Sequence, residues 1–154
     1  MKTEFYKTLG VKGLNSRFKQ AAINGYLHIV EHFLTSRELQ HNVDIHFDND
    51  YTFRVACKKG YLEMVRFLLT SDKLSEHVDI HTQQELGLKK ACEFGHLEVI
   101  QYLLFSPELT EHANPYANES IFQVATKEAT MLLLSFKLEK ELPLSNNNTR
   151  KHKI

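Results

Sequence analysis

The sequence predicts an all-α solenoid built from stacked helix–turn–helix units, and two observations carry this prediction. Gly25, Gly60 and Gly95 lie 35 residues apart, within the similar segments AAINGYLHIVEHFL, ACKKGYLEMVRFLL and ACEFGHLEVIQYLL. In addition, residues 43–77 and 78–112 share fifteen identities over 35 aligned positions. A fixed period of about 20 to 50 residues marks a repeat array, in which one supersecondary unit is copied and stacked.

Each copy is expected to hold two helices joined by a tight turn at the glycine. The first helix is predicted over residues 16–24, 52–59 and 87–94. Glycine ends this helix because it adopts the left-handed conformation at little cost. The second helix should begin beside the residue that follows each glycine, namely Tyr26, Tyr61 and His96. Its aliphatic residues recur at helical spacing, as expected for a helix that buries one face.

The segment after the second helix carries its own signals. In each copy a serine precedes a leucine by three residues, at Ser36, Ser71 and Ser106. Because serine is a common helix cap, one extra helical turn is expected there. Residues 43–46 then alternate apolar and polar side chains, which is typical of an extended, strand-like finger.

These units predict one repeat domain over residues 1–142 and a polar tail over 143–154 that we expect to be disordered. The fourth copy lacks the glycine, which fits a terminal repeat that meets a neighbour on one face only. The expected parts of the domain are an N-terminal cap at 1–7, three clear repeats at about 8–42, 43–77 and 78–112, and a degenerate C-terminal capping repeat at 113–142.

The composition excludes several function classes. The 154 residues include 19 basic and 19 acidic side chains, so no overall field attracts the chain to nucleic acid or to an anionic membrane. No apolar run reaches the roughly 18 residues of a membrane-spanning helix, and the N-terminus is too polar for a secretory signal. We therefore expect a soluble, cytoplasmic monomer. Cys57 and Cys92 share one repeat position, where a small, buried, reduced thiol is expected.

Catalytic and metal chemistry find little support. Histidines are numerous, but His46 and His81 are one repeat position seen twice, and no short ligand spacing such as Cys-x2-Cys announces a metal site. The interior cysteines are unsuited to nucleophilic catalysis. The sequence contains no glycine-rich phosphate loop. We expect neither an enzyme nor a bound cofactor, and a nucleic-acid- or metal-binding repeat protein is the alternative of another class.

The second-helix segments GYLEMVRFLL and GHLEVIQYLL resemble the signature of ankyrin repeats, over about residues 8–138. Ala-Cys before the glycine stands where that family usually has Ala-Ala. Two features depart from the family pattern. Its Thr-Pro-Leu-His helix start is replaced by Tyr-Thr-Phe-Arg at 51–54, and the period is 35 residues rather than about 33. The Ser-x-x-Leu insertion is similar to a variant found in bacterial, phage and large-virus ankyrin proteins.

The resemblance implies non-catalytic binding of a partner protein on the concave face, which the residues before each glycine and the fingers would line. Carried over onto this sequence, the candidate residues are Phe47, Asp48, Asp50, Lys58, Lys59, Gln83, Glu85, Glu93, Phe94, Tyr116 and Glu119. Phe94 stands out because its repeat counterparts are Asn24 and Lys59. It is expected either to anchor a partner or to lie against its own repeat. The mixed charges predict salt-sensitive association with a partner selected by charge pattern.

Within this class the sequence leaves the role open. An adaptor and an inhibitor are both compatible with the binding face. The resemblance to the microbial and viral variant adds a third possibility, an effector that antagonises a host protein in the host cytoplasm.

Overall fold

The computed structural model describes residues 10–141, and it confirms the predicted all-α repeat fold. The predicted N-terminal cap at 1–7 and the tail at 143–154 lie outside the described residues. The helices follow in the order α2 (Val11–Ile23), α3 (Leu27–Thr35), the 3-10 turn η1 (Gln40–Asn42), α4 (Phe47–Lys59), α5 (Leu62–Thr70), α6 (Thr82–Phe94), α7 (Leu97–Phe105), α8 (Ser120–Val124) and α9 (Lys127–Glu141).

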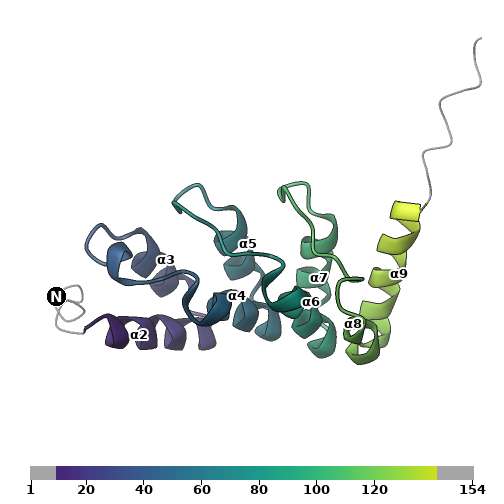
Figure 1. Cartoon of the computed structure of the whole chain (residues 1–154), viewed down its shortest axis with the longest axis horizontal. Helices are drawn as coiled ribbons and strands as arrows, with labels where there is room; N and C mark the ends of the chain where they lie inside the picture. Colours follow the sequence, from purple (N-terminus) through teal and green to yellow (C-terminus); the bar gives the residue numbers. More distant parts are fainter. Residues whose placement is uncertain (1–9, 142–154) are drawn as a thin grey trace, which may run out of the picture.

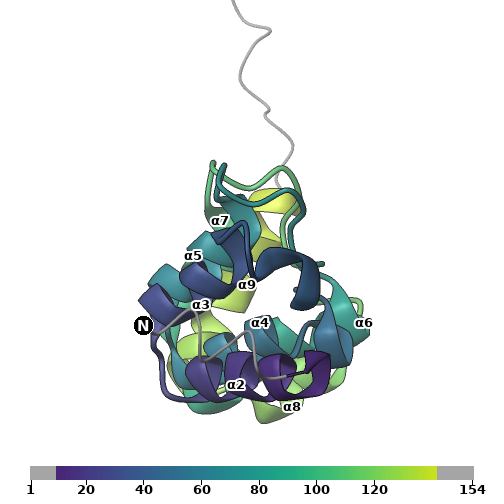
Figure 2. The same cartoon turned by 90° about the vertical axis from the view of Figure 1, so that its left-hand side faces the viewer.

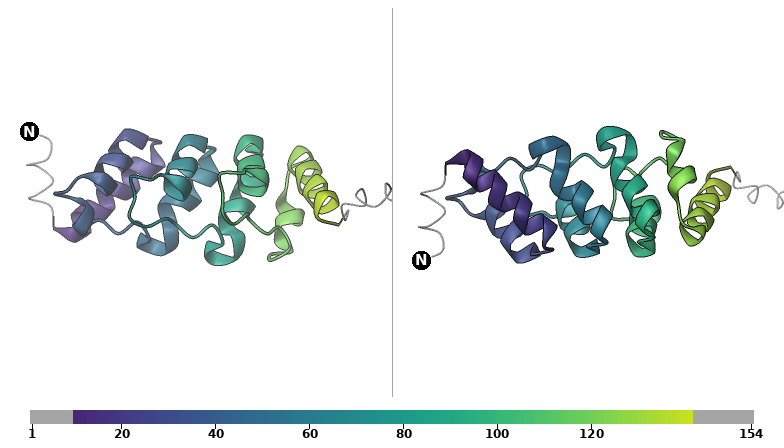
Figure 3. Two further views of the ribbon diagram at one scale, coloured as in Figure 1. Left: turned by 90° about the horizontal axis from the view of Figure 1, so that it is seen from above. Right: turned by 90° about the horizontal axis from the view of Figure 1, so that it is seen from below.

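The helices form two layers that run the length of the molecule. The first helices of the repeats, α2, α4, α6 and α8, pack on one another in sequence order, and α7 packs between α5 and α9 in the other layer (Figures 1 and 3). Viewed along the stack, the layers lie side by side, and loops extend beyond the second helices (Figure 2). Each pair therefore buries its apolar side chains against the next pair, as in other solenoids.

The three hinge glycines, Gly25, Gly60 and Gly95, adopt the predicted left-handed conformation, with φ of 72°, 74° and 71°. The second helices begin at the predicted residues after them. At Gly25 and Gly60, a ring from the next repeat occupies the space that a side chain would need. A β-carbon built on Gly60 would lie 2.5 Å from Nδ1 of His96, and one on Gly25 would lie 2.8 Å from Cζ of Tyr61. Glycine is thus required here for conformation and for space.

The same rings also cap the first helix of the preceding repeat. Nε2 of His96 donates to the carbonyl of Lys58 at 2.8 Å, and the hydroxyl of Tyr61 donates to the carbonyl of Ile23 at 3.4 Å. The last carbonyls of a helix have no partner within the helix. The repeat position after the glycine, Tyr61 or His96, therefore joins neighbouring repeats and completes the helix end.

Small buried residues let the first helices approach closely. Ala21, Ala56 and Ala91 are at most 4 % exposed. Cys57 and Cys92 are fully buried and free, as the sequence predicts. Burial raises the pKa of both thiols, that of Cys92 to about 12, so they stay protonated and act as small apolar residues.

One local prediction holds only in the first copy, and another is wrong. After Ser36 the backbone N–H of Gln40 donates to the serine carbonyl and the helical turn η1 follows. In the second copy the N–H of Leu74 donates to the carbonyl of Ser71 and closes an isolated turn. The predicted strand-like finger at residues 43–46 is not a strand, and the described residues contain none. Asp44 Oδ1 instead accepts a hydrogen bond from the backbone N–H of His46 at 2.8 Å, so the chain turns at once.

An unusual backbone turn follows this bend and opens α4 and α6. Three consecutive residues, 48–50 and again 83–85, have positive φ between 49° and 64°. Left-handed residues other than glycine cost roughly 1–2 kcal/mol each, so the contacts around them must hold the turn. Arg54 contributes at α4 by donating to the carbonyls of Asp48 and Asn49. Right-handed helix follows this turn, close to the start that the sequence predicts.

The fourth repeat has Ala125 at the position of the hinge glycine and Thr126 at the position of Tyr61 and His96. Its first helix, α8, is short and ends at Ala125 in an extended conformation. The backbone N–H of Thr126 donates to the carbonyl of Cys92 at 3.1 Å, and its hydroxyl caps α9 by accepting from the N–H of Ala129. The degenerate repeat therefore closes on the third copy without a left-handed residue.

Candidate partner-binding surface

Five side chains form one exposed cluster around the end of α6. The ring of Phe94 is 48 % exposed and stacks on His96, with centroids 6.4 Å apart and an interplanar angle of 11°. The ammonium of Lys58 lies 5.3 Å from the Phe94 centroid. Glu93 accepts from Nζ of Lys90 at 2.7 Å. One side of the Phe94 ring thus contacts its own repeat, while about half of the side chain faces solvent.

A second cluster lies at the start of α4. Nζ of Lys19, on α2, donates to Asp48 at 2.7 Å and sits 4.0 Å from the centroid of Tyr51 and 5.7 Å from that of Phe47. Arg54 approaches the same Tyr51 ring at 5.6 Å. The left-handed turn brings the Asp48 side chain to Lys19, so the strained backbone places an ion pair on the surface.

Helical geometry connects the two clusters. Tyr51, Arg54 and Lys58 are spaced by three and four residues and therefore follow one side of α4. The 35-residue period places Leu86, Lys89 and Glu93 on the same side of α6. We call this surface the first-helix face and define it by Lys19, Asp48, Tyr51, Arg54, Lys58, Lys59, Lys89, Lys90, Glu93 and Phe94.

The first-helix face is basic although the chain is neutral overall. Six of its residues are Lys or Arg and two are Asp or Glu, a formal charge of +4. A hydrogen bond from Lys90 lowers the pKa of Glu93, and the charges of Lys89 and Lys58 lower it further. A hydrogen bond from Lys19 likewise lowers the pKa of Asp48. Both carboxylates are therefore firmly ionised, and cations outnumber them on this face.

Two of the predicted contact residues are not available for binding. Asp50 and Glu85 are 5 % and 1 % exposed, so their placement on a binding face is wrong. Each carboxylate bonds Nδ1 of the histidine four residues earlier, His46 at 2.6 Å and His81 at a shorter distance. The left-handed turn rotates these side chains inward, and no sequence pattern announced that turn.

The remaining predicted residues reach solvent to different degrees. Lys59, Gln83 and Glu119 are exposed. Phe47 is half-buried against Lys19. Tyr116 is 47 % exposed and stacks on Phe122, with centroids 6.0 Å apart, in the turn before α8. The sequence did not lead us to place Lys19, Tyr51, Arg54, Lys89 or Lys90 on the binding face, although the three- and four-residue spacing from Lys58 and Glu93 could have indicated most of them.

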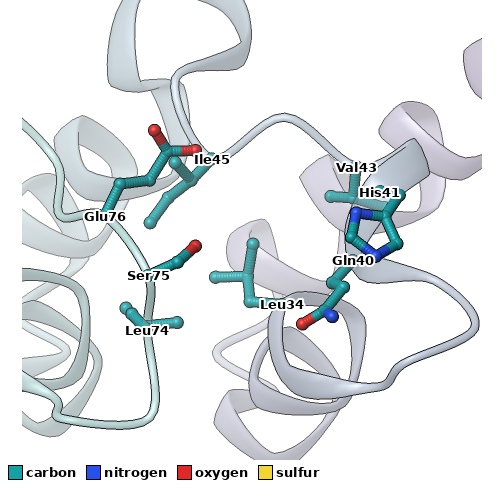
Figure 4. A pocket seen from close by; sticks show the side chains of 8 residues that line it. All are labelled: Leu34, Gln40, His41, Val43, Ile45, Leu74, Ser75 and Glu76. Atoms are coloured by element: carbon teal, nitrogen blue, oxygen red, sulfur yellow. The ribbon is translucent and has the colours of Figure 1, made fainter.

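Shallow grooves between successive loops are a second feature that the sequence did not announce. One groove of about 270 Å³ is lined by Leu34, Val43, Ile45 and Leu74, with polar residues at its edges. Figure 4 shows Leu34 between residues 74–76 on one side and 40–43 on the other. The equivalent groove one repeat later has about 380 Å³. Neither contains a predicted contact residue.

Within residues 10–141, no three His, Cys, Asp or Glu side chains are grouped so that they could hold a metal ion. Several histidines serve as structural hydrogen-bonding groups: His77 and His112, for example, bond the carbonyls of Ser71 and Ser106 at 3.0 Å. No helix in the described part of the chain is long and apolar enough to cross a membrane.

The stacked helix pairs and the hinge geometry define a helix–turn–helix repeat solenoid. A family model described as ankyrin repeats in three copies matches residues 18–119, about two thirds of the sequence, so the chain belongs to the ankyrin-repeat family. Members of this family generally act as protein–protein interaction modules and are typically non-catalytic. Searches of curated proteins and of solved structures found no match.

Proposed function

We propose that this protein binds a partner protein through the first-helix face, without catalysis. The observation that carries the proposal is the exposed side of Phe94 beside Lys58 and Glu93, at a position where the other copies have Asn24 and Lys59. Packing within the fold does not require this ring to stay half in water. Aromatic residues surrounded by charged groups are typical anchors of protein interfaces.

The charge of the face indicates the chemistry of the partner. A surface of +4 attracts an acidic protein surface, which would raise the association rate and make it fall with added salt. The partner would also present an apolar slot for Phe94. Whether binding activates or inhibits the partner depends on what the partner does, and antagonism of a host protein is one form that it could take.

Nucleic acid is the rival ligand for a basic face. Glu93 and Asp48 interrupt the cations, and the long basic run that phosphate tracking favours is absent from α4 and α6. The absorbance ratio at 260 and 280 nm after purification separates the two classes. A protein that carries nucleic acid through high-salt washing would overturn the proposal.

The binding test is affinity capture from a lysate of the organism that encodes the protein. The variant Lys58→Glu, Phe94→Ala should lose a protein that the wild type retains. A matched control, Glu98→Lys with Leu97→Ala, makes one charge reversal and one apolar truncation at exposed positions of α7. It should retain that protein, and an equal loss in both variants would contradict the assignment of the face.

A further inference from the structure

The last helix of the described chain, α9, has apolar residues on two opposite sides. One side packs inward: Ala129 and Leu133 are fully buried, and Phe136 packs edge-on against Phe105 of α7 at 5.5 Å. The other side is open. Met131, Leu134 and Leu138 are 65 %, 48 % and 59 % exposed, and they are three of the most exposed large apolar residues described.

These three residues form a narrow stripe with charged ends. At about 100° of rotation per residue, Met131, Leu134 and Leu138 fall within about 60° of arc. Lys127 and Glu141 continue the same stripe, and the spacing 127, 131, 134, 138, 141 alternates four and three residues. This is the spacing of the contact positions in a two-stranded helical pair. Both end residues are exposed.

We propose that α9 pairs with α9 of a second copy, in antiparallel orientation with the two-fold axis at Leu134. In an antiparallel pair, one residue number rises as the facing number falls. With Leu134 at the axis, the two numbers therefore add up to 268. Lys127 therefore faces Glu141 of the second copy, and Leu134 faces its own equivalent. Met131 of one copy and Leu138 of the other differ from this register by one residue, since their numbers add up to 269, and they pack against each other on either side of the axis.

Charge and position both favour α9 of a second copy as the partner of the stripe. The stripe is self-complementary, since its basic end meets the acidic end of an identical helix, which is what a closed two-fold contact requires. A parallel pair would instead place Lys127 beside Lys127 and Glu141 beside Glu141. In addition, α9 is the last element of the described stack (Figures 1 and 3), and the exposed stripe is distinct from the buried side that packs against α7, so two copies can meet on it without disturbing the repeats.

The expected affinity is modest. Two turns of apolar contact per helix make an interface smaller than that of a standard stable complex. A dissociation constant of about 10 μM to 1 mM is therefore expected. This inference replaces the expectation of a monomer, and it is independent of the first-helix face.

Sedimentation velocity of the full chain, from about 5 μM to about 1 mM, tests the proposal. The apparent mass should rise from 17.9 kDa towards twice that value. Leu134→Glu places two carboxylates together at the axis and should abolish the rise. Leu97→Glu, the same change at an exposed position of α7, and Phe94→Ala should leave it intact.

Charge exchange tests the register. Lys127→Glu alone and Glu141→Lys alone each place like charges together and should weaken dimerisation at least threefold. The double variant restores opposite charges and should recover it. A wild type that stays monomeric over the whole range overturns the proposal, as does a Leu134→Glu variant that still dimerises. Failure of the double variant to recover overturns the antiparallel register.

Discussion

At the scale of single residues, the hinge glycines illustrate how one position serves both conformation and packing. Gly60 has a φ of 74°, and the His96 ring lies where its β-carbon would be. Gly10, by contrast, opens α2 with a φ of −58° and has no atom within 4 Å of its β-carbon position. The two glycines therefore differ in backbone conformation and in the space around the β-carbon position.

Gly60→Ala should lower the free energy of unfolding by about 1–3 kcal/mol, because alanine resists positive φ and displaces the His96 cap. Gly10→Ala is the matched control and should change it by less than about 0.5 kcal/mol. Urea denaturation followed by circular dichroism measures both. Equal effects would show that the hinge geometry contributes nothing specific.

The His81–Glu85 pair predicts a pH dependence of stability. Burial of the His81 ring lowers its pKa, but the hydrogen bond to Glu85 and the charges of Glu85, Asp79 and Glu111 together raise it above the ordinary value of 6.5. A group with a raised folded pKa contributes stability that is full below its unfolded pKa and is lost as pH rises through the folded value. This contribution should therefore disappear on going from pH about 6 to about 8.

Glu85→Gln removes the charge that retains the proton and should flatten this part of the stability curve. His28→Gln changes an exposed histidine on α3 and should leave the slope as in the wild type. Denaturant melts at half-unit pH intervals give the slopes. If Glu85→Gln keeps the wild-type slope, the pair does not control the titration of His81.

At the scale of elements, the bend before α4, α6 and α8 depends on one side-chain oxygen in each copy. Asp44, Asp79 and Asn114 each accept a hydrogen bond from the backbone N–H two residues later, at 2.8, 2.8 and 3.0 Å. This contact sets the direction in which the chain enters the turn that carries Asp48 and Gln83. Asparagine at the third position shows that the oxygen, and not the charge, is needed.

Asp79→Ala should therefore destabilise the fold by about 1 kcal/mol, the usual value of a capping hydrogen bond. Asp79→Asn retains an oxygen acceptor and should cost less than half as much. Thermal melts at pH 7 compare the two variants. A similar loss in both would assign the effect to the charge of Asp79 on His81 and not to the turn.

The elements also show where prediction from sequence succeeds. The ends of α2, α4 and α6 and the starts of α3, α5 and α7 are predictable to within a residue, because Gly25, Gly60 and Gly95 permit few conformations. The beginnings of α4 and α6 are not predictable in this way. The polar residues at 48–50 and 83–85 are compatible with many turns. The contacts that hold the left-handed turn come from residues outside it, such as Arg54 later on α4 and Asn118 in the fourth repeat.

At the scale of the whole molecule, the repeat period determines the architecture but not the surface. Period and apolar spacing place Lys58, Glu93 and Phe94 near one another, and the structure agrees with that placement. The same reasoning misplaced Asp50 and Glu85, because side-chain direction in an irregular turn does not follow from sequence spacing. The net charge of the sequence does not reveal that the first-helix face is basic, since the acidic residues that balance it lie elsewhere on the chain.

The two proposed surfaces have different roles: the first-helix face binds a partner protein, and the α9 stripe pairs two copies of the chain. The first-helix face runs along the side of the stack, whereas the α9 stripe lies at its end. A dimer through α9 would carry two copies of the face, and a partner with two acidic sites would then gain from bivalent binding. Separate variants, Phe94→Ala for the face and Leu134→Glu for the stripe, keep the two functions distinguishable.

The measurement that tests the central claim most directly is the capture experiment with the wild type and the Lys58→Glu, Phe94→Ala variant. Loss of a large aromatic anchor typically costs about 2 kcal/mol or more, which corresponds to a roughly thirtyfold weaker complex. We predict that one protein is retained by the wild type and by the α7 control, is lost by the variant and dissociates with added salt, while all melting temperatures agree. Capture of the same protein by the variant would contradict the assignment of the first-helix face as the binding surface.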